Sequence, residues 1–251
     1  MKERLIRQLQ QWARTMFTPS LEVVDGKINA LSTRQASLIN LAEQLDKRLQ
    51  DLTTALLFDR WESQPFKLNS RNELGYWLNF HALFGEGVEV GVHRGEFSDL
   101  LLQTWKGKRL HSVDPWFEFS EDEYKDVCNV AMRDQEENYQ CTVERLDHFG
   151  ARSSILRQTS KDAANSFKTA SLDFVYIDAQ HHYEAVKEDI ELWSDKVRPG
   201  GLIGGHDYLD GEIDSGFYGV KRAVDEWVND NALELHITRE SAYPSWFVNK
   251  P

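Results

Sequence analysis

The chain has 251 residues, 41% of them hydrophobic and 12% aromatic, which is enough material for one large domain or for one domain with an extension. The formal net charge of −12 argues against a nucleic-acid or anionic-membrane surface as the main partner, because such surfaces need clustered Lys and Arg. No stretch approaches the roughly 20 apolar residues of a transmembrane helix, and Cys128 and Cys141 lack zinc-type or Cys-x-x-Cys spacing. We therefore expect a cytoplasmic protein with reduced thiols and without an integral membrane segment.

Residues 1–60 are predicted to form a helical arm. They begin with MKERLIRQLQQW, which is charged throughout and lacks a continuous apolar segment, so we expect no signal peptide here. Apolar residues then follow an a/d heptad pattern, which is typical of a coiled coil; the core positions are Ile28, Leu31, Gln35, Leu38, Ala42, Leu45, Leu49, Leu52 and Leu56. The alternative is a long helix packed on its own domain. We favour self-association, so that the arm makes the protein a homo-oligomer.

Residues 61–251 are predicted to form one α/β domain, because short apolar runs alternate with amphipathic helices. The expected strands are Gly87–Val92, Arg109–Val113, Ser154–Leu156, Leu172–Ile177, Gly201–Gly205, Leu233–Ile237 and Trp246–Val248. Apolar residues at helical spacing recur between them, for example from Tyr183 to Trp193. This pattern indicates a mostly parallel, seven-stranded sheet. In such a sheet the ligand lies beyond the carboxyl ends of the strands, so residues at the strand ends are candidate site residues.

The first two strand ends indicate an adenosine-type cofactor. The turn in VEVGVHRGEFSDLL contains Gly91 and Gly95, which let a ligand approach the backbone and the start of a helix. Asp114 ends the next strand, where a carboxylate can accept hydrogen bonds from both ribose hydroxyls. Glu89 precedes this turn, and a carboxylate there suits a free ammonium group better than a pyrophosphate. The pattern therefore favours S-adenosylmethionine over NAD.

The region from about Gly87 to Trp246 resembles the class I S-adenosylmethionine-dependent methyltransferases, and in particular macrocin-type sugar O-methyltransferases. The motifs that carry the resemblance are EVGVHRGEFS, HSVDPW, ILRQTSKDAA, LDFVYIDAQHHYEAVKEDIELW, VRPGGLIGGHDY and GVKRAVDEW. The resemblance implies a Rossmann-like sheet in which Glu89, Gly91 and Gly95 line the methionine part of the cofactor and Asp114 binds the ribose. It further implies that Trp116 flanks the adenine, that Thr159 and Ser160 lie at its edge, and that Asp178 lies near the transferred methyl group.

Two later strand ends bring titratable residues to the reacting end of this site. DFVYIDAQHHYEAV supplies Asp178 and His181, and GGLIGGHDY supplies His206 and Asp207. Methyl transfer to a hydroxyl needs in-line alignment and removal of a proton, which either histidine or a divalent cation can assist. The resemblance implies Mg²⁺ (or Mn²⁺) held by Asp178 and Asp207. Gln180 departs from the family, which often has an acid there, so His181 and His206 both remain candidate bases.

Two variable segments are expected to determine the acceptor. The first, residues 115–152, contains aromatic residues, the acidic run Glu121–Glu123 and a polar helix. The second, LDGEIDSGFYGV, contains glycines that suggest a mobile loop. Neither segment identifies the acceptor. The resemblance implies a hydroxyl of a sugar, glycan or related small metabolite. A nicotinamide-dependent oxidoreductase and a catalytically inactive coiled-coil scaffold are the alternative functions.

Overall fold

The computed structural model describes residues 2–64, 66–120, 129–213 and 216–251. The acidic run Glu121–Glu123 and Cys128 lie outside these residues. The chain divides into two compact units, Met1–Leu56 and Leu57–Pro251. Among the described residues, no helix combines the length and the apolar character needed to cross a bilayer.

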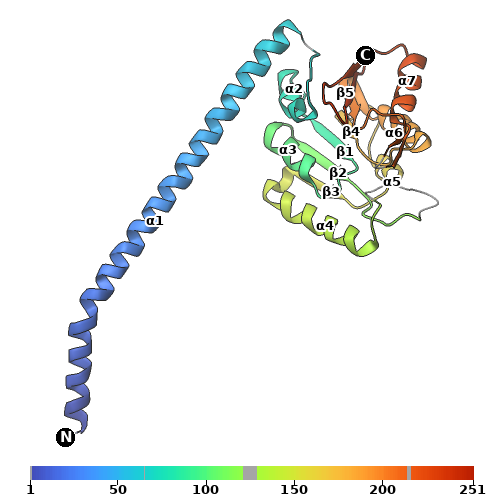
Figure 1. Ribbon diagram of the computed structural model, residues 1–251. Coiled ribbons are helices and arrows are strands. Elements are labelled where there is room, and N and C mark those ends of the chain that lie inside the picture. The colour runs from blue at the N-terminus through green and yellow to red at the C-terminus, as the bar shows by residue number, and fades with distance from the viewer. Residues whose placement is uncertain (1, 65, 121–128, 214–215) are drawn as a thin grey trace. The chain divides into compact units, whose positions relative to one another are not determined.

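One long helix, α1 (Lys2–Ser63), provides the whole of the first unit (Figure 1). The helical prediction for this region is therefore confirmed. The apolar heptad residues from Leu31 onward are all exposed in this chain, and Leu56 reaches 73%. A coiled coil remains a prediction. In the second unit, the last turns of α1 bury Leu57 and Trp61 in a core.

The second unit contains a seven-stranded sheet with the order β3-β2-β1-β4-β5-β9-β8. Its strands are β1 (Glu86–Val90), β2 (Arg109–Val113), β3 (Ser153–Leu156), β4 (Leu172–Ile177), β5 (Val197–Gly205), β8 (Leu235–Ile237) and β9 (Trp246–Asn249). Strands β1 to β5 are parallel, and β9 is antiparallel to both of its neighbours. The predicted α/β fold with a mostly parallel sheet is confirmed, and all seven predicted strands are present.

Helices cover both faces of this sheet (Figure 1). The described helical elements of the second unit are η1 (Arg71–Glu73), α2 (Leu74–Phe80), α3 (Glu96–Thr104), α4 (Met132–Leu146), η2 (Asp147–Arg152), α5 (Ser160–Ala164), α6 (Tyr183–Ser194) and α7 (Val220–Asp230). Apolar residues of α5, α6 and α7 form one core with the sheet, and those of α2, α3 and the end of α1 form the other. Burial on both faces explains why β4, LDFVYI, is an unbroken apolar run apart from Asp173.

The strand order reverses between β1 and β4, which are adjacent although far apart in sequence. Val90 at the end of β1 is level with Val113 of β2 and with Ile177 of β4. The residues that follow these strands, Gly91, Asp114 and Asp178, therefore emerge at the same edge of the sheet. This edge is where ligands bind in open α/β sheets.

The segment after HDY, for which the glycines predict a mobile loop, contains two short strands, and its mobility stays a prediction. Strands β6 (Gly211–Ile213) and β7 (Gly216–Tyr218) pair in antiparallel orientation. Gly211 has φ +100° and Gly216 has φ +146°, conformations that L side chains rarely adopt. The glycines thus shape a hairpin whose second strand ends at the buried Tyr218, which lines the site described below.

Candidate active site

A cavity of about 590 Å³ lies at the carboxyl ends of β1, β2, β4 and β5. Of the residues predicted from the sequence, nine line it: Glu89, Gly91, Asp114, Thr159, Ser160, Asp178, His181, His206 and Asp207. Gly95 and Trp116 are not among its lining residues. The structure thus brings most of the predicted residues together around one cavity, which is large enough for a nucleoside-sized ligand.

The turn after β1 depends on Gly91. Its φ is +86°, and a Cβ built on it would lie 1.9 Å from the carbonyl oxygen of Asp178. Only glycine allows this contact between the turn and the end of β4. Gly95 has φ +77° and is the N-cap residue of α3, so it shapes the end of the same turn.

Glu89 is a buried carboxyl at the inner end of the cavity. Its side chain comes from β1, is 1% exposed, and accepts a hydrogen bond from Ser98 of α3. Burial raises the pKa of Glu89 to about 8, while the hydrogen bond from Ser98 and the charge of Arg71 oppose the rise. A cationic ligand group beside Glu89 would favour its ionised form.

Asp114 holds the turn through backbone contacts as well as lining the cavity. One carboxylate oxygen accepts hydrogen bonds from the backbone N–H groups of Val92 (2.8 Å) and His93 (3.0 Å), and the other from that of Trp116 (2.7 Å). Burial raises the pKa of Asp114, and these three donors oppose the rise. The oxygen that accepts from Trp116, Oδ1, takes only this one bond and keeps a second lone pair, so it can still accept a hydrogen bond from a ribose hydroxyl.

Trp116 does not reach the cavity, contrary to the prediction. Its φ of +44° turns the side chain inward, where the ring is fully buried, donates to the carbonyl oxygen of His93 and packs against Tyr139. The next residue, Phe117, is 54% exposed and lines the cavity in its place. An aromatic side chain is therefore available on this side, but it is one residue later than predicted.

Ser160 lines the opposite wall together with an unpredicted carboxyl, Asp189. The Ser160 hydroxyl donates to Asp189 of α6 and accepts from the Trp193 indole N–H at 2.8 Å. Asp189 is 6% exposed, and burial raises its pKa to about 7, with the Ser160 hydrogen bond opposing the rise. The sequence held a signal for it, since Asp189 interrupts the apolar face that includes Val186 and Ile190.

Asp178, at the end of β4, is oriented by an arginine that the sequence did not reveal. Nη1 of Arg71, in η1, donates to Oδ2 of Asp178 at 2.9 Å. The guanidinium also lies 4.8 Å from the centre of the Phe97 ring. The second oxygen of Asp178, Oδ1, therefore faces the histidines at the ends of the neighbouring elements.

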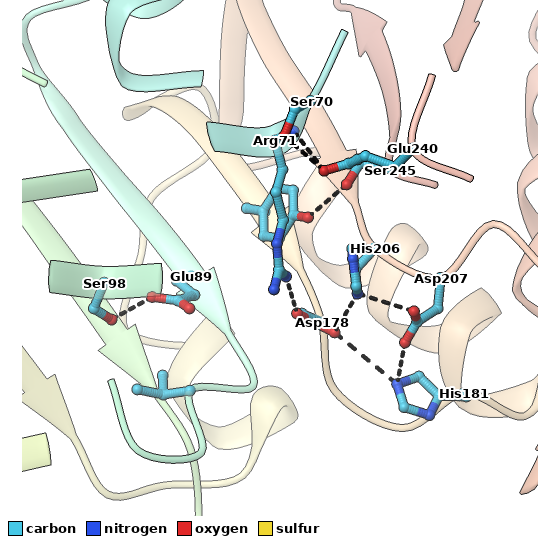
Figure 2. Close-up of polar contacts among 12 residues, drawn as sticks. Ser70, Arg71, Glu89, Ser98, Asp178, His181, His206, Asp207, Glu240 and Ser245 are labelled. Carbon is cyan, nitrogen blue, oxygen red and sulfur yellow. Dashed lines mark hydrogen bonds and ion pairs between the residues drawn. The ribbon is translucent and has the colours of Figure 1, made fainter. Parts of the chain in front are cut away.

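These four residues, Asp178, His181, His206 and Asp207, form what we call the strand-end cluster (Figure 2). Nε2 of His181 lies 3.0 Å from Oδ2 of Asp207, and Nδ1 of His206 lies 2.9 Å from Oδ1 of Asp207. The same two nitrogens lie 4.0 and 3.7 Å from Oδ1 of Asp178. Burial alone would raise the pKa of Asp207, but its contacts with the two histidines outweigh burial and lower it. Asp207 is therefore a carboxylate that stays ionised.

Two tyrosines back the imidazole rings. The His181 ring stacks on Tyr218 with 4.8 Å between centroids, and the His206 ring stacks at 6.4 Å on Tyr243, which is 38% exposed. Both tyrosines line the cavity. The reacting end of the cavity thus combines acid–base groups with aromatic faces.

The donor set fits a divalent cation. One ligand atom each from Asp178, His181 and Asp207 can be chosen so that all three lie within 4.8 Å of one another. Among the described residues, Oδ1 of Asp207 is a buried oxygen without a hydrogen bond of good geometry, although Nδ1 of His206 lies 2.9 Å from it. Carboxylate oxygens suit Mg²⁺ or Mn²⁺, while the imidazole would also suit a transition metal.

Comparisons with known proteins agree with this fold. Residues 88–208 match a protein-family model described as a methyltransferase domain. An uncharacterized protein, R132, of Acanthamoeba polyphaga mimivirus is 27% identical over 127 residues, which are 49% of this chain and 51% of that one. The chain thus spans about half the length of this curated relative.

Three solved structures share the fold at low sequence identity. A putative rRNA-methylase from Clostridium thermocellum has a TM-score of 0.52 at 12% identity, covering 73% of this chain and 98% of that one. An O-methyltransferase family protein from Burkholderia thailandensis has a TM-score of 0.52 at 13% identity, and the match covers 82% of this chain and 60% of that one. The O-methyltransferase TomG from Streptomyces achromogenes, solved with S-adenosylmethionine, has a TM-score of 0.50 at 12% identity. This match covers 72% of this chain and 79% of that one.

The sheet order and the cavity at its reversal point agree with the match of residues 88–208 to a methyltransferase-domain model. The second unit has the α/β fold with the sheet of methyltransferase type.

Proposed function

We propose that the protein transfers a methyl group from S-adenosylmethionine to a hydroxyl of a sugar, glycan or related small metabolite, as macrocin-type O-methyltransferases do. The observation that carries this proposal is the strand-end cluster, in which Asp207 contacts two histidines on the side of the cavity that faces Asp178. A hydroxyl acceptor must lose a proton during transfer, and this cluster supplies candidate proton acceptors at neutral pH.

The cofactor would lie with its adenosine towards Asp114, Thr159 and Ser160 and its methionine end towards Glu89 and Gly91. Its methyl group would then face Asp178. An acceptor hydroxyl placed between the methyl group and the cluster could pass its proton to His181 or His206 as the new carbon–oxygen bond forms. The bond between the methyl carbon and sulfur breaks at the same time, and S-adenosylhomocysteine leaves. Ionised Asp207 would stabilise the resulting imidazolium. General-base catalysis of this kind typically contributes about 10²- to 10⁴-fold in rate.

A divalent cation is part of the proposal. Asp178 and Asp207 would hold Mg²⁺ or Mn²⁺, and His181 is within reach as a third ligand. When bound, such an ion lowers the pKa of a coordinated hydroxyl and fixes its position. The exposed Tyr243 ring offers a face against which a sugar ring could pack.

The arm of α1 is proposed to join copies of the chain. Its heptad residues from Leu31 to Leu56 present a continuous apolar stripe, and such a stripe is usually covered by a partner. The pattern repeats along one helix with Gln35 as a polar core position, which suits a second copy of the same arm. Residues 1–60 would then be an oligomerisation arm and residues 61–251 the methyltransferase domain.

Calorimetric titration with S-adenosylhomocysteine and with NAD tests the cofactor assignment. Binding of the first compound alone supports a methyltransferase, binding of NAD alone would support an oxidoreductase, and binding of neither would support an inactive scaffold. Incubation with S-adenosylmethionine and a panel of sugars, nucleotide sugars and phenols then tests the acceptor class. If only phenols or amines are methylated, the sugar proposal is wrong.

A further inference from the structure

We propose that Arg71 binds the α-carboxylate of the methionine part of S-adenosylmethionine, so that a residue from outside the matched methyltransferase domain completes the cofactor site. This inference rests on the proposed orientation of the cofactor. Arg71 belongs to η1, seventeen residues before the matched region begins at residue 88. No motif in the sequence pointed to it.

The first argument is charge. S-adenosylmethionine ends in an α-amino acid, with an ammonium and a carboxylate on the same carbon. Among the described residues that line the cavity, one is an arginine, Arg71, and one is a lysine, Lys161. Lys161 is paired with Glu188 on the wall that contains Ser160. Arg71 is therefore the permanent cation available at the other end, beside the carboxyls of Glu89 and Asp178.

The second argument is position. The Arg71 guanidinium lies over Phe97, the second residue of α3, which begins at the Gly91–Gly95 turn. It also contacts Asp178, whose carbonyl oxygen would meet a Cβ on Gly91. These neighbours place Arg71 at the reversal between β1 and β4, rather than at the aromatic faces of Tyr218 and Tyr243. Figure 2 shows the side chains of Arg71, Glu89 and Asp178 in one view. One cation with two carboxyls complements a zwitterion, because the ligand's carboxylate can bind Arg71 and its ammonium can bind Glu89.

The third argument is preorganisation. Glu240 fixes the segment, since Oε1 accepts from the Ser70 hydroxyl at 2.7 Å and from the Arg71 backbone N–H at 3.2 Å. An arginine guanidinium is always protonated in proteins, so this side chain carries a fixed positive charge. A guanidinium has five N–H donors, so the bond to Asp178 does not exhaust it. A fixed, charged fork is suited to a carboxylate.

The test compares two ligands that differ only in the carboxylate. S-adenosylhomocysteine carries it, and S-adenosyl-3-thiopropylamine keeps the ammonium but lacks the carboxylate. Calorimetry on the full chain should show that the wild type binds S-adenosylhomocysteine about tenfold or more tightly than the amine. In Arg71→Met this preference should largely disappear, through loss of affinity for S-adenosylhomocysteine alone, and Arg71→Lys should keep part of it.

Arg198→Met is the matched control. Arg198 makes the same kind of contact with Asp173, the second residue of β4 (Nε to Oδ1, 2.7 Å), that Arg71 makes with Asp178 after the strand. This control should keep the wild-type preference. Equal loss of affinity for both ligands in Arg71→Met, or no loss for either, would overturn the inference, as would a wild type without a preference. If the wild type binds neither ligand, the proposed function itself fails.

Discussion

Replacing Glu89 with Gln should stabilise the ligand-free protein while weakening cofactor binding. Glu89 is 1% exposed, and burial raises its pKa from an ordinary 4.5 to about 8. The folded state thus binds this proton more tightly than the unfolded state. The contribution of Glu89 to stability is therefore complete below pH 4.5 and is lost as the pH rises towards 8. At pH 7, about 2.5 units above the ordinary value, the loss is roughly 3 kcal/mol at about 1.4 kcal/mol per unit.

Glutamine removes the charge but keeps the shape, so we expect a gain of about 1 to 3 kcal/mol in the free energy of unfolding at pH 7, or roughly 2 to 10 °C in Tm. Urea unfolding of both proteins between about pH 5 and pH 8 measures it. The difference should grow with pH, because the other titrating groups are common to both proteins. Affinity for S-adenosylhomocysteine should fall about tenfold or more, since the ammonium loses a charged acceptor.

Glu86 provides a control with the opposite sign on the same strand. Hydrogen bonds from Lys108 and His111 lower its pKa against a smaller effect of burial. The contribution of Glu86 to stability is present above its ordinary pKa and is lost as the pH falls. Glu86→Gln should therefore destabilise the protein near pH 7. It should leave cofactor affinity unchanged. A Glu89→Gln variant that is less stable than wild type at pH 8, or a difference independent of pH, would refute the reasoning about buried charge.

Four further predictions follow from the site and the arm. Asp178→Ala should abolish methyl transfer, and Asp207→Ala should lower kcat at least about a hundredfold. Near wild-type turnover of either variant with the true acceptor would show that the site assignment is wrong. Gly91→Ala should cost about 2 kcal/mol or more in urea unfolding, because its Cβ would meet the Asp178 carbonyl at positive φ; unchanged stability would contradict the tight turn. Exhaustive chelation should lower turnover, and full activity afterwards would remove the cation from the scheme. A chain beginning at Leu57 should have a monomeric mass by light scattering, and an oligomeric mass equal to that of the full chain would exclude the arm as the cause of association.

The sheet could be predicted because its central strands are buried on both faces. A strand such as β4 is then a short apolar run, and period and length together identify it. The predicted elements differ from the observed ones where a strand end is set by the backbone conformation of one residue, or where a strand is very short. The first strand was expected to reach Val92 but ends at Val90, because the positive φ of Gly91 takes the chain out of the sheet. Strands β6 and β7 were missed because three residues each are too few to show a pattern.

Site residues that directly follow a strand of the sheet could be predicted from the sequence. Site residues that come from other elements could not. Asp178 and Asp207 follow apolar strands, so the topology alone brings them to one edge. Arg71 reaches the same place from a three-residue helix whose anchor, Glu240, is 169 residues away in sequence, and no local signal records such a contact. The orientation of Trp116 was equally hidden, since a single positive φ decides whether it points into the cavity or the core.

The strand-end cluster also constrains how a metal and a base can coexist. Nε2 of His181 faces both Asp207 and Asp178, so the nitrogen that could ligate an ion is the same one that contacts the carboxylates. An ion held there by Asp178, Asp207 and His181 would need a neutral His181, and His206 would then be the candidate proton acceptor. Without the ion, either histidine can serve, because ionised Asp207 supports both. With the ion bound, His181→Gln should therefore weaken metal affinity, whereas His206→Gln should lower kcat with metal affinity retained. The reverse pattern would assign the base to His181.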